Sequence, residues 1–325
     1  MSVAVTGGSG VVGRAVVRHL VAAGEDVWAL ARSPESSEVL SLMGANVVTG
    51  DLLNAVAVSR LVKGREKVFH VAGVNEMCSR DLARMWRVNV DGTMSVLDAA
   101  IGAGVRRFIH TSSAATIGED RGTVGTEITP HRGYFLSQYE RSKTVAERLV
   151  LDRSDEIDVV SVNPSSVQGP GRSTGTGAIF LAAARGNLRF VIDATVSLVD
   201  IDDCARGHLA AASQGRTGQR YILSGPVVTV REAVRMLNKH LGHRIAPWFV
   251  QPRAVTAIAP IVDAAFRIAG RRSLLCAESA RVLLHGHRYD ASRSSEELGL
   301  EYTSLDDTLV RTLEWFRSEG LAKEG

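Results

Sequence analysis

The stretch Thr6-Gly7-Gly8-Ser9-Gly10-Val11-Val12-Gly13 follows directly on a short apolar run, Ser2–Thr6, and opens a helical pattern, Val11–Ala23. Glycines at positions 7, 10 and 13 allow a tight turn, close approach of the backbone to a pyrophosphate, and close packing of the helix on the strand. The free N–H groups at the start of that helix attract phosphate oxygens. This strand–turn–helix context predicts a dinucleotide-binding loop.

Outward from the loop, short β-branched runs alternate with longer helical patterns. The expected strands are Ser2–Thr6, Asp26–Ala31, Asn46–Gly50, Lys67–Ala72, Arg106–Ser112 and Ile157–Asn163. The expected helices between them are Val11–Ala23, Pro34–Met43, Asn54–Val62, Asp81–Ile101 and Phe135–Arg153. Because the strands are short and apolar, as in a sheet that is buried on both faces, this alternation predicts an α/β fold with a doubly wound parallel sheet.

The pattern changes after Asn163, where prolines and glycines cluster between positions 164 and 177. A chain of 325 residues is longer than one ordinary domain. We therefore expect a Rossmann-type dinucleotide-binding domain over residues 1–166 and a smaller C-terminal α/β lobe over residues 167–325 that binds the substrate. The segment 193–213 is expected to add one strand and one helix that return to the first domain.

The composition is that of a folded protein without a nucleic-acid partner. Hydrophobic residues make up 45% and charged residues 22% of the chain, which excludes a disordered protein. The 38 basic and 35 acidic residues leave a net charge of +3, and no basic run concentrates it. Because the sequence shows neither a secretory signal nor a stretch long enough to span a membrane, a cytoplasmic protein is expected.

The cysteines and histidines suggest neither a disulfide framework nor a metal site. Cys78, Cys204 and Cys276 are odd in number and far apart, which suits a reducing cytosol. The histidine pairs at 240/243 and 285/287 have no further ligand at the usual spacing, so no metal is expected.

The most apolar stretch of the second half, Ala254–Ala269, is interrupted by Pro260, Asp263 and Arg267. This pattern predicts an amphipathic or buried helix, and a helix lying on a membrane surface is the alternative. The same stretch suggests that the substrate is hydrophobic.

The end of the second strand decides between the two nicotinamide dinucleotides. NAD-binding proteins usually place an acid about 20 residues after the glycine loop, whereas this chain has Ala31 followed by Arg32. A guanidinium can pair with a ribose 2′-phosphate, which makes NADP(H) the expected cofactor; a solvated charge is the alternative for Arg32. Asp51 and Leu52, after the third strand, are expected to meet the adenine, or Asp51 caps the next helix.

Tyr139 and Lys143 lie four residues apart in a helical pattern and so share one face of the helix. A neighbouring ammonium lowers the pKa of a tyrosine from near 10, so that its phenol can exchange a proton with a carbonyl or alcohol oxygen. The fifth strand ends in Thr111-Ser112-Ser113, at the edge where ligands of such sheets bind. Ser113, or Ser112 as the second choice, is expected to hydrogen-bond the reacting oxygen.

With these motifs in place, the sequence resembles the extended short-chain dehydrogenases/reductases, the NAD(P)-dependent epimerase/dehydratase superfamily. The similar stretches are TGGSGVVG at 6–13, GDL at 50–52, VFHVAG at 68–73, VNVDGT at 88–93, FIHTSSAATIG at 108–118, YERSKTVAE at 139–147, VNPSSVQGPG at 162–171, VDIDDCARGHLAA at 199–211 and RYDASRSSEELGL at 288–300. Within the superfamily the chain looks most like the dihydroflavonol-reductase-like members.

The resemblance implies a role for each matching residue. Tyr139 would be the acid/base, Lys143 its pKa partner and ribose clamp, and Ser113 the group that stabilises the substrate oxygen. The implied cofactor contacts beyond the loop are Val71, Ala72, Gly73, Asn89, Thr111, Ser112, Pro164, Ser166 and Val167. Among them, Ala72 and Gly73 would line the ribose, Pro164 and Val167 would flank the nicotinamide, and Asn89 would support the sheet.

The expected function is an NADP(H)-dependent oxidoreductase that moves a hydride between the nicotinamide and a ketone or secondary alcohol. Dehydration is not expected, because Ser113 is followed by Ala114 and Ala115, where the related dehydratases carry an acidic pair. A sugar-nucleotide epimerase working on retained NAD is the alternative, and a reductase-like sensor of the NADP redox state is another. The resemblance also implies a homodimer.

Four further residues are open candidates for substrate contacts or solvent-facing positions: His131, Tyr134, Arg271 and Arg272.

Overall fold

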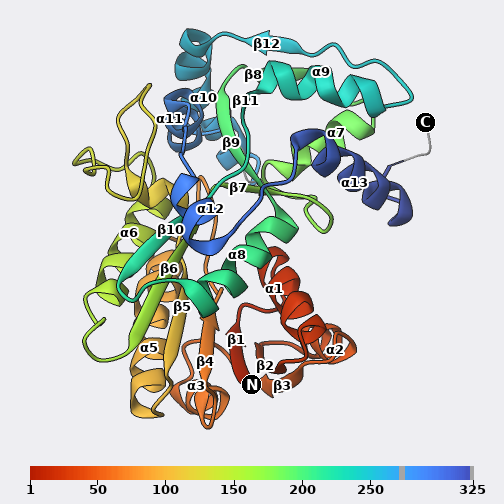
Figure 1. The fold of residues 1–325 in the computed structure, drawn as a ribbon. Helices are drawn as coiled ribbons and strands as arrows, with labels where there is room; N and C mark the ends of the chain where they lie inside the picture. The colour runs from red at the N-terminus through yellow and green to blue at the C-terminus, as the bar shows by residue number, and fades with distance from the viewer. Residues whose placement is uncertain (271–274, 323–325) are drawn as a thin grey trace.

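The computed structural model describes residues 1–270 and 275–322, and a seven-stranded parallel sheet forms its lower part (Figure 1). The strand order is β10-β6-β5-β4-β1-β2-β3, and every neighbouring pair is parallel. The strands are β1 (Ser2–Thr6), β2 (Asp26–Ala31), β3 (Asn46–Thr49), β4 (Lys67–His70), β5 (Arg107–Thr111), β6 (Asp158–Pro164) and β10 (Gln219–Leu223). The predicted doubly wound parallel sheet is confirmed.

Helices cover both faces of this sheet, and alternate residues of β1 point to opposite faces. Val3 and Val5 pack on the side of α1 (Val11–Ala22), α2 (Pro34–Leu42) and α8 (Ile201–Gln214). Ala4 packs on the other side, with α3 (Ala55–Val62), α5 (Gly92–Gly102) and α6 (Gln138–Leu151). Because both faces are buried, these strands are apolar throughout rather than alternating.

The upper part of the molecule is a second lobe with its own core. A three-stranded sheet has the order β11-β9-β7, and a two-stranded ribbon pairs β12 with β8. These strands are β7 (Ser166–Gln168), β8 (Phe190–Ile192), β9 (Thr195–Asp200), β11 (Val227–Thr229) and β12 (Trp248–Val250). The lobe's helices are α7 (Gly177–Ala184), α9 (Val230–His240), α10 (Pro252–Ile268), α11 (Ala277–His285) and α13 (Leu305–Ser318). The helix α12 (Ser292–Leu298) instead packs against α8 and β10, and its Leu298 lies in the core of the seven-stranded sheet.

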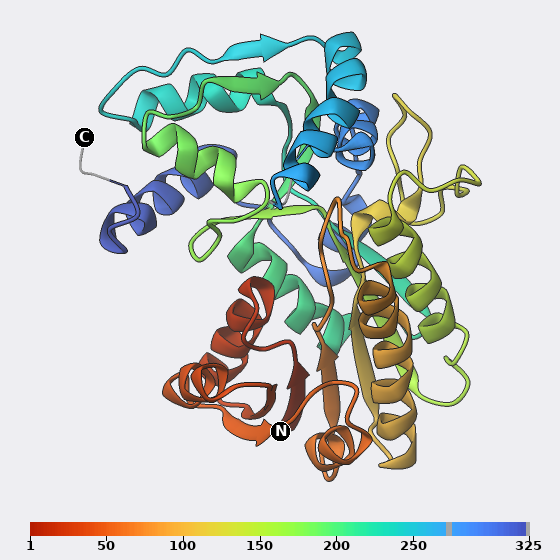
Figure 2. The ribbon, with the colours of Figure 1, turned by 180° about the vertical axis from the view of Figure 1, so that it is seen from behind.

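The chain crosses between the two parts more than once (Figure 2). Within the segment 193–213, β9 pairs in the second sheet, whereas α8 packs against α1. The strand that joins the main sheet is β10, which lies parallel to β6. The sequence analysis did not predict β10. Its sequence, QRYIL, is only five residues long and follows a loop, so its hydrophobic pattern is too short to indicate a strand.

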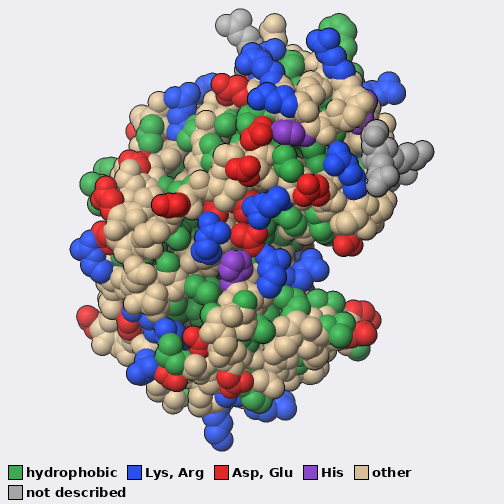
Figure 3. Space-filling view, turned by 45° about the vertical axis from the view of Figure 1, so that its right-hand side comes forward, with side chains coloured by type: hydrophobic (Ala, Val, Ile, Leu, Met, Phe, Trp, Pro, Cys, Tyr) green, Lys and Arg blue, Asp and Glu red, His purple; other side chains and the backbone are tan. Residues whose placement is uncertain are grey.

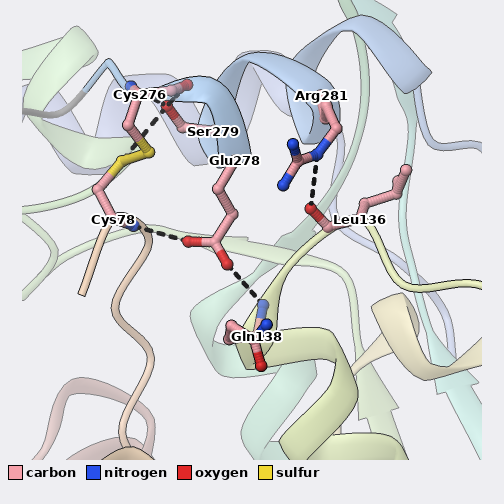
Figure 4. Close-up of a disulfide and its surroundings, with 7 residues drawn as sticks. All are labelled: Cys78, Leu136, Gln138, Cys276, Glu278, Ser279 and Arg281. Carbon is pink, nitrogen blue, oxygen red and sulfur yellow. Dashed lines mark hydrogen bonds between the residues drawn. A yellow bond between two sulfur atoms is a disulfide. The ribbon is translucent and has the colours of Figure 1, made fainter. Parts of the chain in front are cut away.

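The expectation that no disulfide forms was wrong. Cys78 and Cys276 are bonded, with their Cα atoms 6.0 Å apart, although 198 positions separate them in sequence. Cys78 lies in the loop after β4, and Cys276 is the residue before α11. The bond therefore ties the part of the molecule that contains the seven-stranded sheet to the second lobe (Figure 4). Cys204 is free and buried in α8.

This tether should stabilise the folded protein. Closing a loop of 198 residues lowers the entropy of the unfolded chain, so reduction should lower the free energy of unfolding by about 3–5 kcal/mol. Urea unfolding of the oxidised protein with and without dithiothreitol measures the difference. The double variant Cys78→Ser/Cys276→Ser is the control, since the reductant should leave its midpoint unchanged. Equal midpoints for oxidised and reduced wild type would contradict the prediction.

Candidate active site

The glycine loop is fixed by backbone contacts that leave no room for side chains. Gly7 has φ of +70°, and a Cβ there would lie 2.6 Å from the Ala72 Cα atom after β4. At Gly13 a Cβ would lie 2.0 Å from the Gly7 carbonyl oxygen. The Gly10 N–H donates to that same oxygen, and α1 begins at Val11. Glycine is thus required for both the turn and the helix packing.

The loop lies between the carboxyl ends of β1 and β4, where the strand order reverses. In open α/β sheets this switch point is where ligands bind. The Thr6 hydroxyl lies 2.8 Å from His70 Nδ1, and the Ala72 N–H donates to the same hydroxyl at 3.3 Å. His70 is fully buried, and burial together with the Lys143 charge lowers its pKa to about 3. This neutral network locks β1 to β4 beneath the predicted dinucleotide.

Arg32 and Asp51 lie at neighbouring strand ends, after β2 and β3. Arg32 Nη1 is 3.9 Å from Asp51 Oδ2, and both side chains are largely exposed. Asp51 accepts from the Leu53 N–H, whereas Asn54 is the residue that caps α3. Ser33, directly after Arg32, caps α2. A guanidinium beside a helix N-terminus is a suitable position for a phosphate.

Ser113 and Tyr139 are brought together at the carboxyl end of β5. Ser113 begins a short 3₁₀ helix, Ala114–Ile117, and Tyr139 lies in the first turn of α6. Burial raises the pKa of the Tyr139 phenol, while a hydrogen bond with Ser113 and the charge of Arg172 oppose the increase. Both hydroxyls are therefore available to one oxygen atom of a ligand.

Lys143 lies one helical turn after Tyr139, and its ammonium donates to the Thr111 carbonyl at 2.7 Å. Burial lowers its pKa to about 8, although the Glu147 carboxylate opposes the decrease. The charge that acts on Tyr139 in this structure comes from Arg172. The role of Lys143 as pKa partner of Tyr139 therefore stays a prediction.

Asn89 holds the loop after β4 against α6. Its amide oxygen accepts from the Val74 N–H at 2.7 Å, and its amide nitrogen donates to the Val74 carbonyl and to Ser142 Oγ. Asn89 lies in a π-helical turn, Arg87–Asp91, between α4 (Leu82–Trp86) and α5. The side chain is fully buried, so it acts by positioning Val74 and Ser142.

The expected nicotinamide side is formed by the junction of β6 and β7. Pro164 ends β6, while Ser166 and Val167 lie in β7. The loop after β7 carries Arg172, which the sequence analysis missed. Its Nε atom is buried and has no hydrogen-bond partner among the described residues. An arginine after a glycine-rich loop gives no sequence signal of its own, so only the fold shows its closeness to Tyr139.

A buried polar network, also missed, supports the site from behind. Glu147 accepts hydrogen bonds from Thr116, Ser161 and Asn163, and pairs with Arg220 at 3.1 Å. These groups come from the 3₁₀ helix, α6, β6 and β10. The network holds the segment that follows Ser113 against the helix that carries Tyr139 and Lys143.

The disulfide region lies beside α6, the helix that carries Tyr139. Glu278 of α11 accepts from the Cys78 N–H at 2.9 Å and from the Gln138 N–H at 2.5 Å (Figure 4). A cavity of about 440 Å³ lies next to it, lined by Tyr134, Phe135, Leu136, Ser137, Gln138, Arg141, Glu278 and Arg281. Tyr139 is not in its lining. The surface is also hollowed between the two lobes, where basic side chains gather (Figure 3).

Other polar residues cluster around Glu119 and Glu140. Glu119 lies beside His285 and His287, and one candidate ligand atom from each residue lies within 4.8 Å of the others. The spacing of the histidines in the sequence did not indicate this group, because Glu119 is distant from them along the chain. His131 packs over Gly118 and lies 3.7 Å from Glu140. Arg271 and Arg272 lie outside the described residues.

With this geometry in view, comparison with known proteins identifies the family. The family model described as "NAD dependent epimerase/dehydratase family" matches residues 3–224, which contain the glycine loop, Ser113, Tyr139 and Lys143. The chain belongs to this family.

Two curated relatives match almost the whole chain. "Sterol demethylase protein B" of Methylococcus capsulatus is 31% identical and covers 99% of this chain and 100% of the relative. A Synechocystis protein with the provisional description dihydroflavonol 4-reductase is 30% identical and covers 98% of this chain and 95% of the relative. The crystal structure of gox2253 has a TM-score of 0.86 at 28% identity and covers 99% of both chains. These matches agree with the resemblance found in the motifs.

The buried Lys143 should make stability depend on pH. Its pKa is about 8 in the folded protein and about 10.4 in an unfolded chain. Between these values the unfolded chain holds one more proton, so wild-type stability rises relative to Lys143→Met by at most about 1.4 kcal/mol per pH unit.

Urea unfolding of both proteins at pH 7, 8, 9 and 10 measures this difference. The exposed Lys63→Met variant is the control, and its difference from wild type should stay constant over the same range. A constant difference for Lys143→Met as well would contradict the lowered pKa.

Proposed function

We propose that the protein is an NADP(H)-dependent oxidoreductase that interconverts a ketone and a secondary alcohol. The observation that carries the proposal is the placement of Ser113 and Tyr139, with Lys143 one turn further along α6, at the carboxyl edge of the sheet that also holds the glycine loop. When bound, the nicotinamide supplies the hydride that reaches the carbonyl carbon. The products are the secondary alcohol and the oxidised dinucleotide.

In this proposal Tyr139 donates its phenolic proton to the substrate oxygen, and Ser113 donates a hydrogen bond to the same atom. Burial raises the pKa of the phenol, so Tyr139 is protonated and ready to act as the acid in the reductive direction. Arg172 then stabilises the phenolate that remains, because its charge already acts on this group. The alcohol is oxidised by the same steps in reverse.

The proposed substrate is an apolar, ring-containing ketone or alcohol. The names of the two curated relatives refer to a sterol and to a dihydroflavonol. Both names describe ring systems that carry an oxygen function. The hydroxyls of Ser113 and Tyr139 can both contact the one oxygen atom of such a molecule that reacts.

The variant Tyr139→Phe tests the catalytic assignment. It removes the proton donor and keeps the ring, so kcat should decrease by a factor of about 10² to 10⁴. The affinity for NADPH, measured by fluorescence titration, should change by less than about twofold, because the loop and Arg32 remain. Oxidation of NADPH with a panel of cyclic ketones gives kcat. Wild-type turnover in the variant would refute the assignment.

The variant Arg32→Ala tests the cofactor. Loss of the guanidinium should weaken NADPH binding about tenfold or more and leave NADH binding nearly unchanged, since only NADPH carries the 2′-phosphate. Replacement of Arg60, in the last turn of α3, by alanine is the control.

A different result would favour the epimerase alternative. If the purified protein retains NAD, and NADPH and NADH bind wild type equally, the proposal of NADP(H) fails. Net oxidation of added NADPH would then be absent, and nucleotide sugars would be the substrates to examine.

A further inference from the structure

The helix α10 presents an apolar face to solvent. Its exposed residues with described side chains are Thr256, Ala257, Ile258, Pro260, Ile261, Ala264, Ala265, Phe266 and Ile268. All of them except Thr256 are apolar. Ile258, Ile261, Ala265 and Ile268 follow each other at helical spacing and form one stripe. Ile261 and Ile268 keep 69% and 90% of their surface exposed.

The opposite face of α10 is already used for packing. Val255 and Ala259 are buried in a small core with Ala280 of α11, and Ile192 and Val250 pack against this core. The exposed stripe is thus not the side that attaches the helix to its own lobe. Scattered apolar residues are normal on a protein surface, but a continuous face of them marks a binding surface.

The ribbon beside α10 adds two exposed aromatic rings. Trp248 of β12 is paired with Phe190 of β8, and Val250 with Ile192. Residues two apart on a strand point to the same face of it. Trp248 and Phe190 therefore lie on the same face of the ribbon as Val250 and Ile192, which pack against the core of α10. Trp248 and Phe190 are 78% and 68% exposed. Figure 1 shows β12 leading directly into α10.

Basic residues lie close to the aromatic pair in the sequence. The residues next to the aromatic pair, Arg189 beside Phe190 and the nearby Arg244, are exposed. An apolar helix face together with an exposed tryptophan and nearby exposed arginines is the composition that binds the interface of a membrane with anionic lipids.

We propose that α10 and the aromatic pair Phe190–Trp248 dock the protein on the surface of a membrane that contains anionic lipids. No helix within residues 1–270 and 275–322 is long and apolar enough to cross a bilayer, so the contact is peripheral. The isoleucines and the two rings enter the headgroup region, while Arg189 and Arg244 contact lipid phosphates. The docked lobe is the one that the substrate is proposed to occupy.

Co-sedimentation with sucrose-loaded vesicles tests the proposal. Wild type should pellet with vesicles of phosphatidylcholine and phosphatidylglycerol, should bind pure phosphatidylcholine more weakly, and should be released as salt rises. Trp248 fluorescence should shift to the blue on binding, and Trp248→Phe should bind without that shift. The double variant Ile261→Glu/Ile268→Glu should lose at least tenfold in binding, with an unchanged melting temperature.

The matched control is Leu42→Glu/Ile128→Glu, which places two acids at exposed apolar positions of the other part of the molecule. This control should bind like wild type. Failure of wild type to bind the mixed vesicles, or equal loss in both double variants, would overturn the proposal.

Light scattering tests whether a second copy of the chain covers this face instead. A wild-type dimer that Ile261→Glu/Ile268→Glu converts to a monomer would assign the face to a second copy and overturn the membrane proposal. Vesicle binding is independent of turnover, so either result leaves the proposed reaction to its own test.

Discussion

The contact between the Gly7 turn and the backbone of Ala72 determines where everything else in the site can lie. A Cβ at Gly7 would come within 2.6 Å of Ala72 Cα, so the ends of β1 and β4 pack as closely as two backbones allow. The Thr6–His70 pair below it is buried and uncharged, and its hydrogen bond keeps the two strands in register. The loop after β4 then begins at a fixed point, and Asn89 holds its next residues against α6.

Much of this arrangement could be predicted from local sequence. The glycine loop, the strands β1 to β6 and the Tyr139–Lys143 spacing each depend on residues close together in the chain. The parallel sheet then brings strand ends together by a general rule, so Ser113 could be placed near Tyr139 before the structure. Leu305–Ser318 forms a helix because its apolar positions repeat at helical spacing and Ser304 caps its start.

What the sequence could not show depends on contacts between distant segments. Cys78 and Cys276 are 198 positions apart, and no spacing rule connects them. Arg172 gains its relation to Tyr139, and Glu119 its relation to His285 and His287, only through the fold. The strand β10 is five residues long and is recognised as a strand by its pairing with β6. The apolar pattern of α10 was visible, but which of its faces would be buried depended on α11 and the β8–β12 ribbon.

The π-helical turn at residues 87–91 has a consequence for how this chain can change without losing its site. A π turn holds one residue more than the α-helical turn it replaces. Deleting one residue there would restore a regular helix and rotate all preceding side chains by about 100° around the axis. Asn89 would then face away from Val74 and Ser142, and the loop after β4 would lose both of its hydrogen bonds with Asn89. The loss of a single codon there would thus affect the site in the same way as a substitution of Asn89.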